Sequence, residues 1–271
     1  MMKFVDVGVS YRTPGKHAAL NAFLGKCVGV ATTLRFRAMI DGGTFHVIDC
    51  TAGDGQHSEY SKATSPGIIC RHLEFLLHRR LPCKATFYER SQSNAVLLRK
   101  AVLDWPVIND DAANMQPSWK ANDVLFVVND PNTINDWVLP KALQSAPKLT
   151  TVFSTLGCNV GGLKRLKRED RQGWYSHVES QLKLLQPWHD SLIVTLEGDK
   201  AQWAYLVNSP TAEGWQLDLE LAFQRAFSDT GHALRMAWSK SQPDAFKDIL
   251  DDLFLTRKER AEMKQTTLEG V

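Results

Sequence analysis

Carboxylate side chains recur at one kind of position in this chain, at the end of short apolar runs that predict β-strands. The set is Asp49, Glu89, Asp110, Asp111 and Asp130. The carboxyl ends of parallel strands meet at one edge of a sheet, which is where α/β folds bind ligands. Carboxylates there can accept hydrogen bonds from ribose hydroxyls or amino groups, and they attract a cationic ligand. The spacing therefore predicts one binding site assembled from successive strand ends.

The loop after the first of these runs, CTAGDG, is built for close approach by a ligand. Ala52, Gly53 and Gly55 are small, and glycine tolerates positive φ where a chain turns. Asp49 and Asp54 place negative charge beside this turn. That charge would repel the pyrophosphate of a dinucleotide and attract a cationic amino acid, and the loop lacks the G-x-G-x-x-G spacing. The pattern favours an adenosyl-amino-acid ligand.

The later strand ends fit successive parts of such a ligand. Glu89 could accept both ribose hydroxyls, and Asp110 or Asp111 could accept the adenine amino group. Asn129 adds a polar side chain at the fourth strand end. Each residue also has a purely structural interpretation, as a turn, a solvated rim residue or an N-cap. Their order on consecutive strands favours the ligand site.

Strands and helices must alternate to place these residues. Apolar runs predict strands and helical spacing predicts helices between them, which indicates a Rossmann-like, doubly wound, mainly parallel α/β sheet with helices on both faces and an antiparallel edge hairpin. We expect a single domain over 1–271, with a helical lead-in at 16–40 and a helical extension at 211–271. The strands are predicted at 45–50, 84–90, 106–110, 123–130, 148–155, 190–198 and 201–210, and the main helices at 65–81, 91–105, 137–146 and 177–188.

Four sequence stretches resemble a known family. IDCTAGDG is similar to motif I of class I S-adenosylmethionine-dependent methyltransferases, and FYER, INDDA and VVNDPNT are similar to their second, third and fourth motifs. Residues 16–137 most resemble the three-Cys-motif partner proteins within that superfamily. The resemblance implies that S-adenosylmethionine contacts Asp49, Ala52, Gly53, Gly55, Glu89 and one of Asp110 and Asp111.

The fourth motif is also similar to the element that holds the target amine in amino-methyltransferases. By that likeness, Asp130 and Pro131 would hold the acceptor. The sequence continues with Asn132 and Thr133, so it lacks the second proline and the aromatic residue of that element. This departure weighs against methylation of a base nitrogen.

A basic loop offers a surface for a substrate. Its five cations fall within eight positions, close to two aromatic residues, and the set is Lys164, Arg165, Lys167, Arg168, Arg171, Trp174 and Tyr175. Cations that contact phosphates and aromatics that stack on bases are the chemistry of nucleic-acid grooves. The alternative is a solvated helix face, partly neutralised by Glu169 and Asp170.

Bulk properties limit the other possibilities. Among 271 residues, 44% are hydrophobic, enough for a substantial core, and the net charge of +2 requires any nucleic-acid contact to be local. The five cysteines show no spacing typical of a disulfide framework, which predicts free thiols. The sequence shows no apolar run long enough to span a membrane and no leader pattern, so we expect a cytoplasmic protein. His57 could act as a base or lie on the surface, and the i, i+6 spacing of His72 and His78 implies no metal.

The leading hypothesis is therefore a methyltransferase that acts on a nucleic acid. A second is a catalytically silent methyltransferase fold that serves as a binding or partner module in a defence or mobile-element system. A third is another enzyme with an adenosyl ligand, or a small-molecule methyltransferase. The sequence leaves the acceptor atom and the oligomeric state open.

Overall fold

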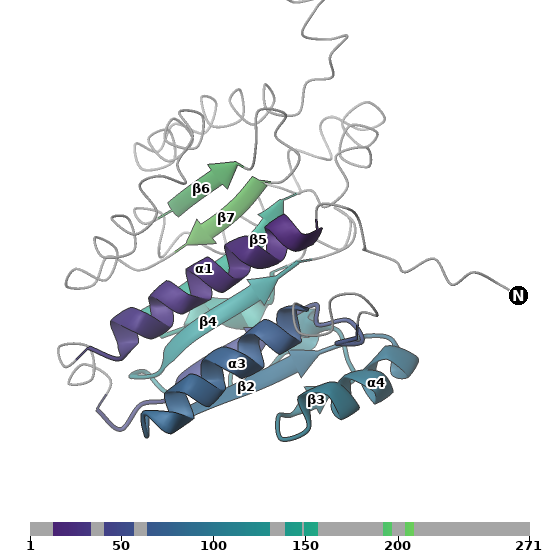
Figure 1. The fold of residues 1–271 in the computed structure, drawn as a ribbon, viewed down its shortest axis with the longest axis horizontal. Coiled ribbons are helices and arrows are strands. Elements are labelled where there is room, and N and C mark those ends of the chain that lie inside the picture. The colour runs from purple at the N-terminus through teal and green to yellow at the C-terminus, as the bar shows by residue number, and fades with distance from the viewer. Residues whose placement is uncertain are drawn as a thin grey trace, which may run out of the picture.

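The fold was determined as a computed structural model that describes residues 13–33, 41–56, 64–130, 139–147, 149–156, 192–196 and 204–208. Seven strands form one sheet in the order β3-β2-β1-β4-β5-β7-β6 (Figure 1). The strands are β1 (Phe45–Asp49), β2 (Cys83–Tyr88), β3 (Val107–Ile108), β4 (Val124–Asn129), β5 (Leu149–Leu156), β6 (Leu192–Leu196) and β7 (Ala204–Asn208).

The first five strands are parallel, and β1 lies in their centre. It pairs with β2 on one side and β4 on the other, so that Val47 lies between Ala85 and Phe126. All residues of β1 and β4 are buried, as expected for central parallel strands covered on both faces. This confirms the predicted parallel α/β sheet. The strand order reverses between β1 and β4.

The last two strands pair in the opposite sense. β7 is antiparallel to β5, and β6 is antiparallel to β7, with Val194 opposite Leu206. The connection between them, residues 197–203, lies outside the described residues, as do the predicted helix at 177–188 and the extension at 211–271. The turn of the predicted hairpin and the single-domain boundaries therefore stay predictions.

In the described part of the chain, three α-helices precede or follow the strands. They are α1 (Thr13–Ala31), α3 (Ser65–His78) and α4 (Gln92–Val102), and two short 3-10 helices are η1 (Ala112–Asn114) and η3 (Lys141–Ser145). Thr64 caps α3 by accepting the Gly67 N–H, and Ser91 caps α4 by accepting the Asn94 N–H. These hydroxyls satisfy donors that have no partner inside the helix.

The first helix is shorter at its C-terminal end than the lead-in predicted at 16–40. It ends at Ala31, and the hydroxyls of Thr32 and Thr33 donate to the carbonyls of Gly29 and Val30. Threonine hydroxyls that bond back to the preceding turn compete with continuation of a helix. The apolar pattern of this segment predicted a longer helix and did not indicate that it ends at Ala31.

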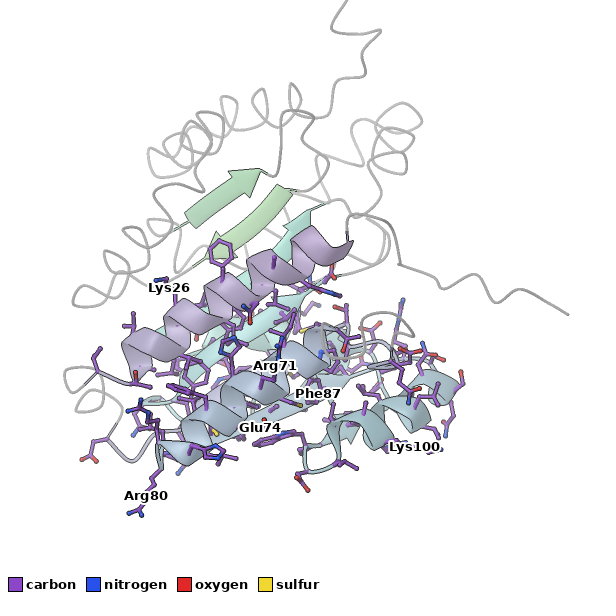
Figure 2. The ribbon with its side chains drawn as sticks, viewed as in Figure 1. Lys26, Arg71, Glu74, Arg80, Phe87 and Lys100 are labelled. Atoms are coloured by element: carbon purple, nitrogen blue, oxygen red, sulfur yellow. The ribbon has the colours of Figure 1, made fainter. Side chains whose placement is uncertain are left out.

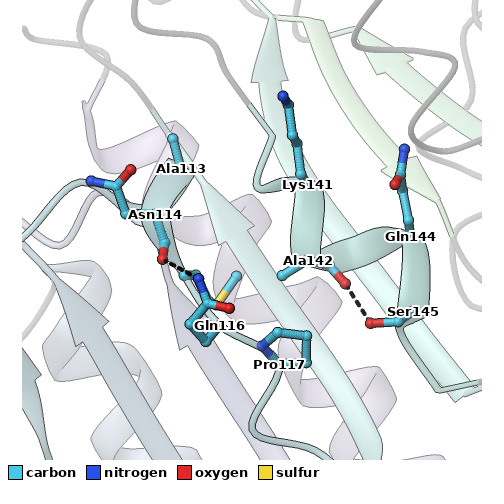
Figure 3. Close-up of a pocket in the computed structure, with 9 residues that line it drawn as sticks. Ala113, Asn114, Gln116, Pro117, Lys141, Ala142, Gln144 and Ser145 are labelled. Atoms are coloured by element: carbon cyan, nitrogen blue, oxygen red, sulfur yellow. Dashed lines mark hydrogen bonds between the residues drawn. The ribbon is translucent and has the colours of Figure 1, made fainter.

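The hydrophobic core lies between the sheet and the helices α1 and α3. Phe45, Phe87, Phe126 and Phe153 are fully buried, and the Phe23 ring of α1 packs 5.5 Å from that of Phe153. Figure 1 shows α1, α3 and α4 together on one face of the sheet. Charged residues labelled on these helices in Figure 2, such as Lys26 and Arg71, are exposed to solvent. On the opposite face, the described helical turns are η1 and η3 (Figure 3).

Candidate functional site

The order of the strands locates the candidate site. In a doubly wound sheet, a crevice opens at the carboxyl ends of the two strands between which the strand order reverses. Here those strands are β1 and β4, which end at Asp49 and Asn129. The predicted ligand residues that follow β1, β2, β3 and β4 are thus brought to one edge of the sheet.

The loop that follows β1 is anchored to both neighbouring strands. The Cys50 N–H donates to Val128 O (2.8 Å) in β4, and the Ala52 N–H donates to Tyr88 O (3.1 Å) in β2. The buried Asp49 accepts the Thr51 N–H through Oδ1 (3.1 Å). Because these bonds fix the backbone before any ligand arrives, the loop is a preorganised cradle.

The two glycines of this loop have the same backbone conformation and different surroundings. Gly53 and Gly55 have φ of 67° and 68°. A Cβ at Gly53 would meet no atom within 4 Å, whereas a Cβ at Gly55 would lie 2.9 Å from Leu98 Cδ1 and 3.0 Å from Ala101 Cβ of α4. Gly53 therefore leaves space for a ligand, and Gly55 allows α4 to pack against the loop.

Glu89 lies half-buried at the end of β2 with its carboxylate held in place. Its Oε1 accepts the Ser91 N–H (2.7 Å), and its main-chain N–H donates to Ile108 O (3.1 Å). The side-chain amide of Asn109 donates to Glu89 O (2.8 Å). A fixed carboxylate with its second oxygen unused by the described residues suits a ribose diol, which presents two donors.

Asp110 and Asp111 differ in how many of their carboxylate oxygens already have a hydrogen-bond or ion-pair partner. Asp111 caps η1 by accepting the Ala113 N–H (2.8 Å) through Oδ1, and its Oδ2 lies 3.6 Å from Arg90 Nη1. Asp110 accepts both the Asp111 N–H (2.7 Å) and Asn114 Nδ2 (3.0 Å) through Oδ1. These donors lower the pKa of Asp110. Of the two residues, Asp110 has the oxygen that is available to a ligand donor.

Two buried groups at this edge of the sheet have raised pKa values. Burial, with Asp49 and Asp111 nearby, raises the pKa of the Cys50 thiol well above its usual value. Burial, with Cys50 and Asp110 nearby, raises the pKa of Tyr88. Both groups stay neutral at physiological pH, so the negative charge at this edge comes from the carboxylates. Such an edge attracts a cationic sulfonium or ammonium group.

At the end of β4 the structure identifies a residue that the sequence did not single out. Thr51 Oγ1 accepts the Asp130 N–H (2.8 Å), which joins the β1 loop to the β4 terminus across the strand-order reversal. Asn129 is buried, and its Nδ2 donates to Ser154 Oγ (3.4 Å) in β5. The sequence feature that could have identified Thr51 is its hydroxyl group, which stands between Cys50 and Ala52 in a loop of small residues.

Several predicted residues lie outside the described part of the chain. They are Pro131, His57 and the basic loop with Lys164, Arg165, Lys167, Arg168, Arg171, Trp174 and Tyr175. His72 Nε2 lies 3.0 Å from Asn21 Oδ1, and His78 Nδ1 lies 2.7 Å from Glu74 O, so both rings pair with neighbouring helical residues. The described cysteines Cys27, Cys50, Cys70 and Cys83 are free thiols. None of the described helices is both long and apolar enough to cross a membrane.

No family model and no curated protein matches the chain in sequence. Solved structures are similar in fold. A putative class I S-adenosylmethionine-dependent methyltransferase from Listeria monocytogenes is 11% identical with a TM-score of 0.40, and the match covers 76% of this chain and 64% of that one. A TehB-like S-adenosylmethionine-dependent methyltransferase from Corynebacterium glutamicum is 8% identical with a TM-score of 0.35, covering 73% of this chain and all 100% of that one.

A third similar structure is the plantazolicin methyltransferase BpumL in complex with a triazolic desmethylPZN analogue and SAH. It is 13% identical with a TM-score of 0.36, and the match covers 80% of this chain and 84% of that one. These likenesses concern the fold. They give no support to the narrower resemblance to three-Cys-motif partner proteins. The functional conclusion therefore depends on the geometry of the site itself.

Proposed function

We propose that this chain is an S-adenosylmethionine-dependent methyltransferase. One observation carries the proposal: a positive-φ glycine with open space beside it, Gly53, stands in a loop anchored to β2 and β4 at the strand-order reversal. Anchored carboxylates follow the neighbouring strands, with Glu89 after β2 and Asp110 after β3. Small residues and carboxylates in this order suit a cationic adenosyl amino acid.

The residues present fit that cofactor. Asp49, Ala52, Gly53 and Asp54 would surround its amino-acid part, Glu89 would accept from the ribose hydroxyls, and Asp110 would accept from the adenine amino group. S-Adenosylmethionine supplies an electrophilic methyl group to a nucleophile when it is bound. The chain's own contribution is positioning and charge stabilisation.

Asp130 is the residue we assign to the acceptor. It follows β4 beside the cradle, where its main chain is held by Thr51. From that position a carboxylate can accept a hydrogen bond from a nucleophile and orient it. We propose a nucleic acid as the acceptor, supported by the five cations within residues 164–171 and by Trp174 and Tyr175 nearby.

The cofactor assignment is tested by calorimetry with S-adenosylhomocysteine. Glu89→Ala should weaken binding by about 10- to 150-fold, because a charge-assisted hydrogen bond contributes about 1.5–3 kcal/mol. Glu74→Ala is the matched control, since this exposed glutamate lies on α3 and not at the carboxyl edge. Equal affinity of Glu89→Ala and the wild type would remove Glu89 from the site.

The catalytic assignment needs a second measurement. Asp130→Ala should abolish methyl transfer to DNA or RNA while cofactor affinity stays within a few-fold. Full activity in this variant would refute the role of Asp130. A wild-type protein that binds S-adenosylhomocysteine and methylates no nucleic acid would favour the binding module or the small-molecule enzyme, and the Asn132-Thr133 departure in the fourth motif favours the former.

The nucleic-acid surface is tested through salt dependence. Each neutralised phosphate contributes about 0.7 (single strand) or 0.9 (duplex) to the slope of log affinity against log salt. Changing Lys164, Arg165, Lys167 and Arg168 together to alanine should flatten this slope. An unchanged slope would make the loop a solvated face.

A further inference from the structure

A groove lies away from the loop of the proposed cofactor site. It is open to solvent, has a volume of about 570 Å³, and runs between the segment that begins in η1 and the 3-10 helix η3 (Figure 3). Small-molecule sites commonly have volumes of about 300–1,000 Å³. The groove is lined by Ala113, Asn114, Met115, Gln116, Pro117, Lys141, Ala142, Gln144 and Ser145.

A hydrogen bond connects the two segments that form the walls of the groove. The Trp119 indole N–H donates to Ser145 O (2.9 Å), which joins the chain before β4 to the end of η3. Within η3, Ser145 Oγ donates to Ala142 O (3.0 Å). Met115 is buried in one wall, and the Pro117 ring faces Ala142 and Ser145 across the groove (Figure 3).

The polar groups that line the groove are mainly carboxamides. Gln116 Nε2 donates to Asn114 O (3.3 Å), and Asn114 Nδ2 donates to Asp110 Oδ1 (3.0 Å). Gln144 supplies a third amide from η3. An amide presents one acceptor and two donors in a plane, which is the pattern that pairs with the edge of a nucleobase.

The charge of the groove has one sign. Lys141 is the single charged residue among the nine that line it, and it is exposed. Lys141 and Gln144 are three residues apart on a 3-10 helix, so their side chains extend from the same side of η3, as Figure 3 shows. An ammonium group beside planar amides suits a ligand that joins a phosphate to a heteroaromatic ring.

We propose that this groove is a nucleotide-binding site, distinct from the cofactor cradle. The base lies between Pro117 and Ala142 with its edge toward the carboxamides of Gln116 and Gln144, and the phosphate is bound by Lys141. The ligand is a free nucleotide or a nucleotide within a strand, because both carry the same chemistry. The site does not depend on methyl transfer.

Calorimetry on the full chain, saturated with S-adenosylhomocysteine to occupy the cofactor cradle, tests the site. The probes are the four ribonucleoside monophosphates, a short single-stranded oligonucleotide, a nucleoside and inorganic phosphate. The variants are Lys141→Gln and Gln116→Ala, with Lys100→Gln as the matched control because Lys100 is exposed on α4 and does not line the groove. Thermal melting verifies that each variant is folded.

We expect a monophosphate or the oligonucleotide to bind better than nucleoside or phosphate alone. Lys141→Gln should weaken that binding at least about tenfold. Gln116→Ala, as a separate variant, should also weaken it, and Lys100→Gln should leave it unchanged. Preference for the oligonucleotide identifies the strand as the source, and equal binding identifies the free nucleotide. The proposal is overturned if no probe binds at millimolar concentration, if Lys141→Gln binds as the wild type does, or if binding disappears when the cofactor cradle is filled.

If the chain binds no S-adenosylhomocysteine, the methyltransferase proposal fails while the groove remains testable. The same titrations are then performed without it, and the Lys141 and Gln116 variants decide the outcome. A methyltransferase with an empty groove gives the reverse result: wild-type affinity for S-adenosylhomocysteine and no response to nucleotides.

Discussion

The interior of the sheet and its carboxyl edge are built under opposite electrostatic conditions. In the interior, burial lowers the pKa of His46 to about 3, so the ring is neutral, and burial raises the pKa of the Cys27 thiol to about 12. At the edge, hydrogen bonds from Asn114 and a backbone N–H lower the pKa of Asp110 and favour its charge. Burial keeps His46 and Cys27 neutral in the interior, and the edge holds carboxylates with main-chain donors.

This difference separates stability from function. Interior side chains contribute by removing apolar surface from water and by filling space. Edge carboxylates contribute by being held in a charged form at positions a ligand can reach. We therefore expect interior substitutions to change the free energy of unfolding, and edge substitutions to change ligand binding with little effect on unfolding.

The largest effect is expected at the centre of the interior. Phe126 in β4 is fully buried in the core cluster. Phe126→Ala should lower the free energy of unfolding by about 3–5 kcal/mol, from lost burial and the cavity left behind. Chemical denaturation measures this change, and Glu89→Ala should stay within about 1 kcal/mol of the wild type. Similar losses in both variants would abolish the distinction between interior and edge.

The second effect is a pH dependence that comes from the interior. His46 accepts a proton near pH 6.5 when unfolded and only near 3 when folded, because burial and Lys84 lower its pKa although Asp123 raises it. The unfolded state therefore binds more protons between these values, and stability falls as pH decreases from 6.5 toward 3. The slope from this group is at most about 1.4 kcal/mol per pH unit.

Urea denaturation of the wild type and of His46→Gln across this range tests the prediction. The glutamine variant retains a side chain that can hydrogen-bond to Thr86, whose Oγ1 lies 3.0 Å from His46 Nε2, and it has no proton to gain. Its stability should decrease less on acidification than that of the wild type. If the two profiles run in parallel, His46 has no role in the acid dependence.

The interior of the sheet could be predicted from the sequence because burial leaves a clear pattern. The continuous apolar run of β4 and the alternation of strands with helices indicated the parallel sheet, and the structure confirms it. Where hydroxyls compete with the backbone, the pattern failed: the apolar content around α1 did not reveal that Thr32 and Thr33 end it.

The edge could be predicted by residue type and not by bonding partner. The sequence named Asp110 and Asp111 as equivalent candidates with an N-cap as the structural alternative, and the structure shows that Asp111 is the cap and lies beside Arg90. It likewise could not reveal that Thr51 bonds to the backbone of Asp130, because that contact joins residues 79 positions apart. Contacts of this kind depend on the strand order, which periodicity does not encode.

The two loop glycines, Gly53 and Gly55, test the same difference between packing in the interior and ligand binding at the edge. An alanine at either position must adopt positive φ, which costs about 1–2 kcal/mol. Gly55→Ala should cost about 1–3 kcal/mol more than Gly53→Ala, because its Cβ would overlap Leu98 and Ala101. Gly53→Ala should instead produce the greater loss of S-adenosylhomocysteine affinity relative to its loss of stability. Thermal denaturation measures the stability loss and calorimetry the affinity loss for both variants. A larger stability loss in Gly53→Ala, together with a larger affinity loss in Gly55→Ala, would contradict this prediction.

The smallest effect is expected where the two regions meet, at Thr51. Its hydroxyl accepts the Asp130 N–H at 2.8 Å, and a hydrogen bond of this kind contributes about 0.5–1.5 kcal/mol. Thr51→Val keeps the shape of the side chain and removes the acceptor, whereas Thr51→Ser keeps the acceptor and removes a methyl group. If Thr51 positions Asp130, Thr51→Val should reduce the rate of methyl transfer about tenfold while the affinity for S-adenosylhomocysteine changes by less than about threefold, and Thr51→Ser should restore most of the rate. A rate loss shared equally by both variants would show that Thr51 acts through packing of the loop, because the serine hydroxyl still offers the hydrogen bond.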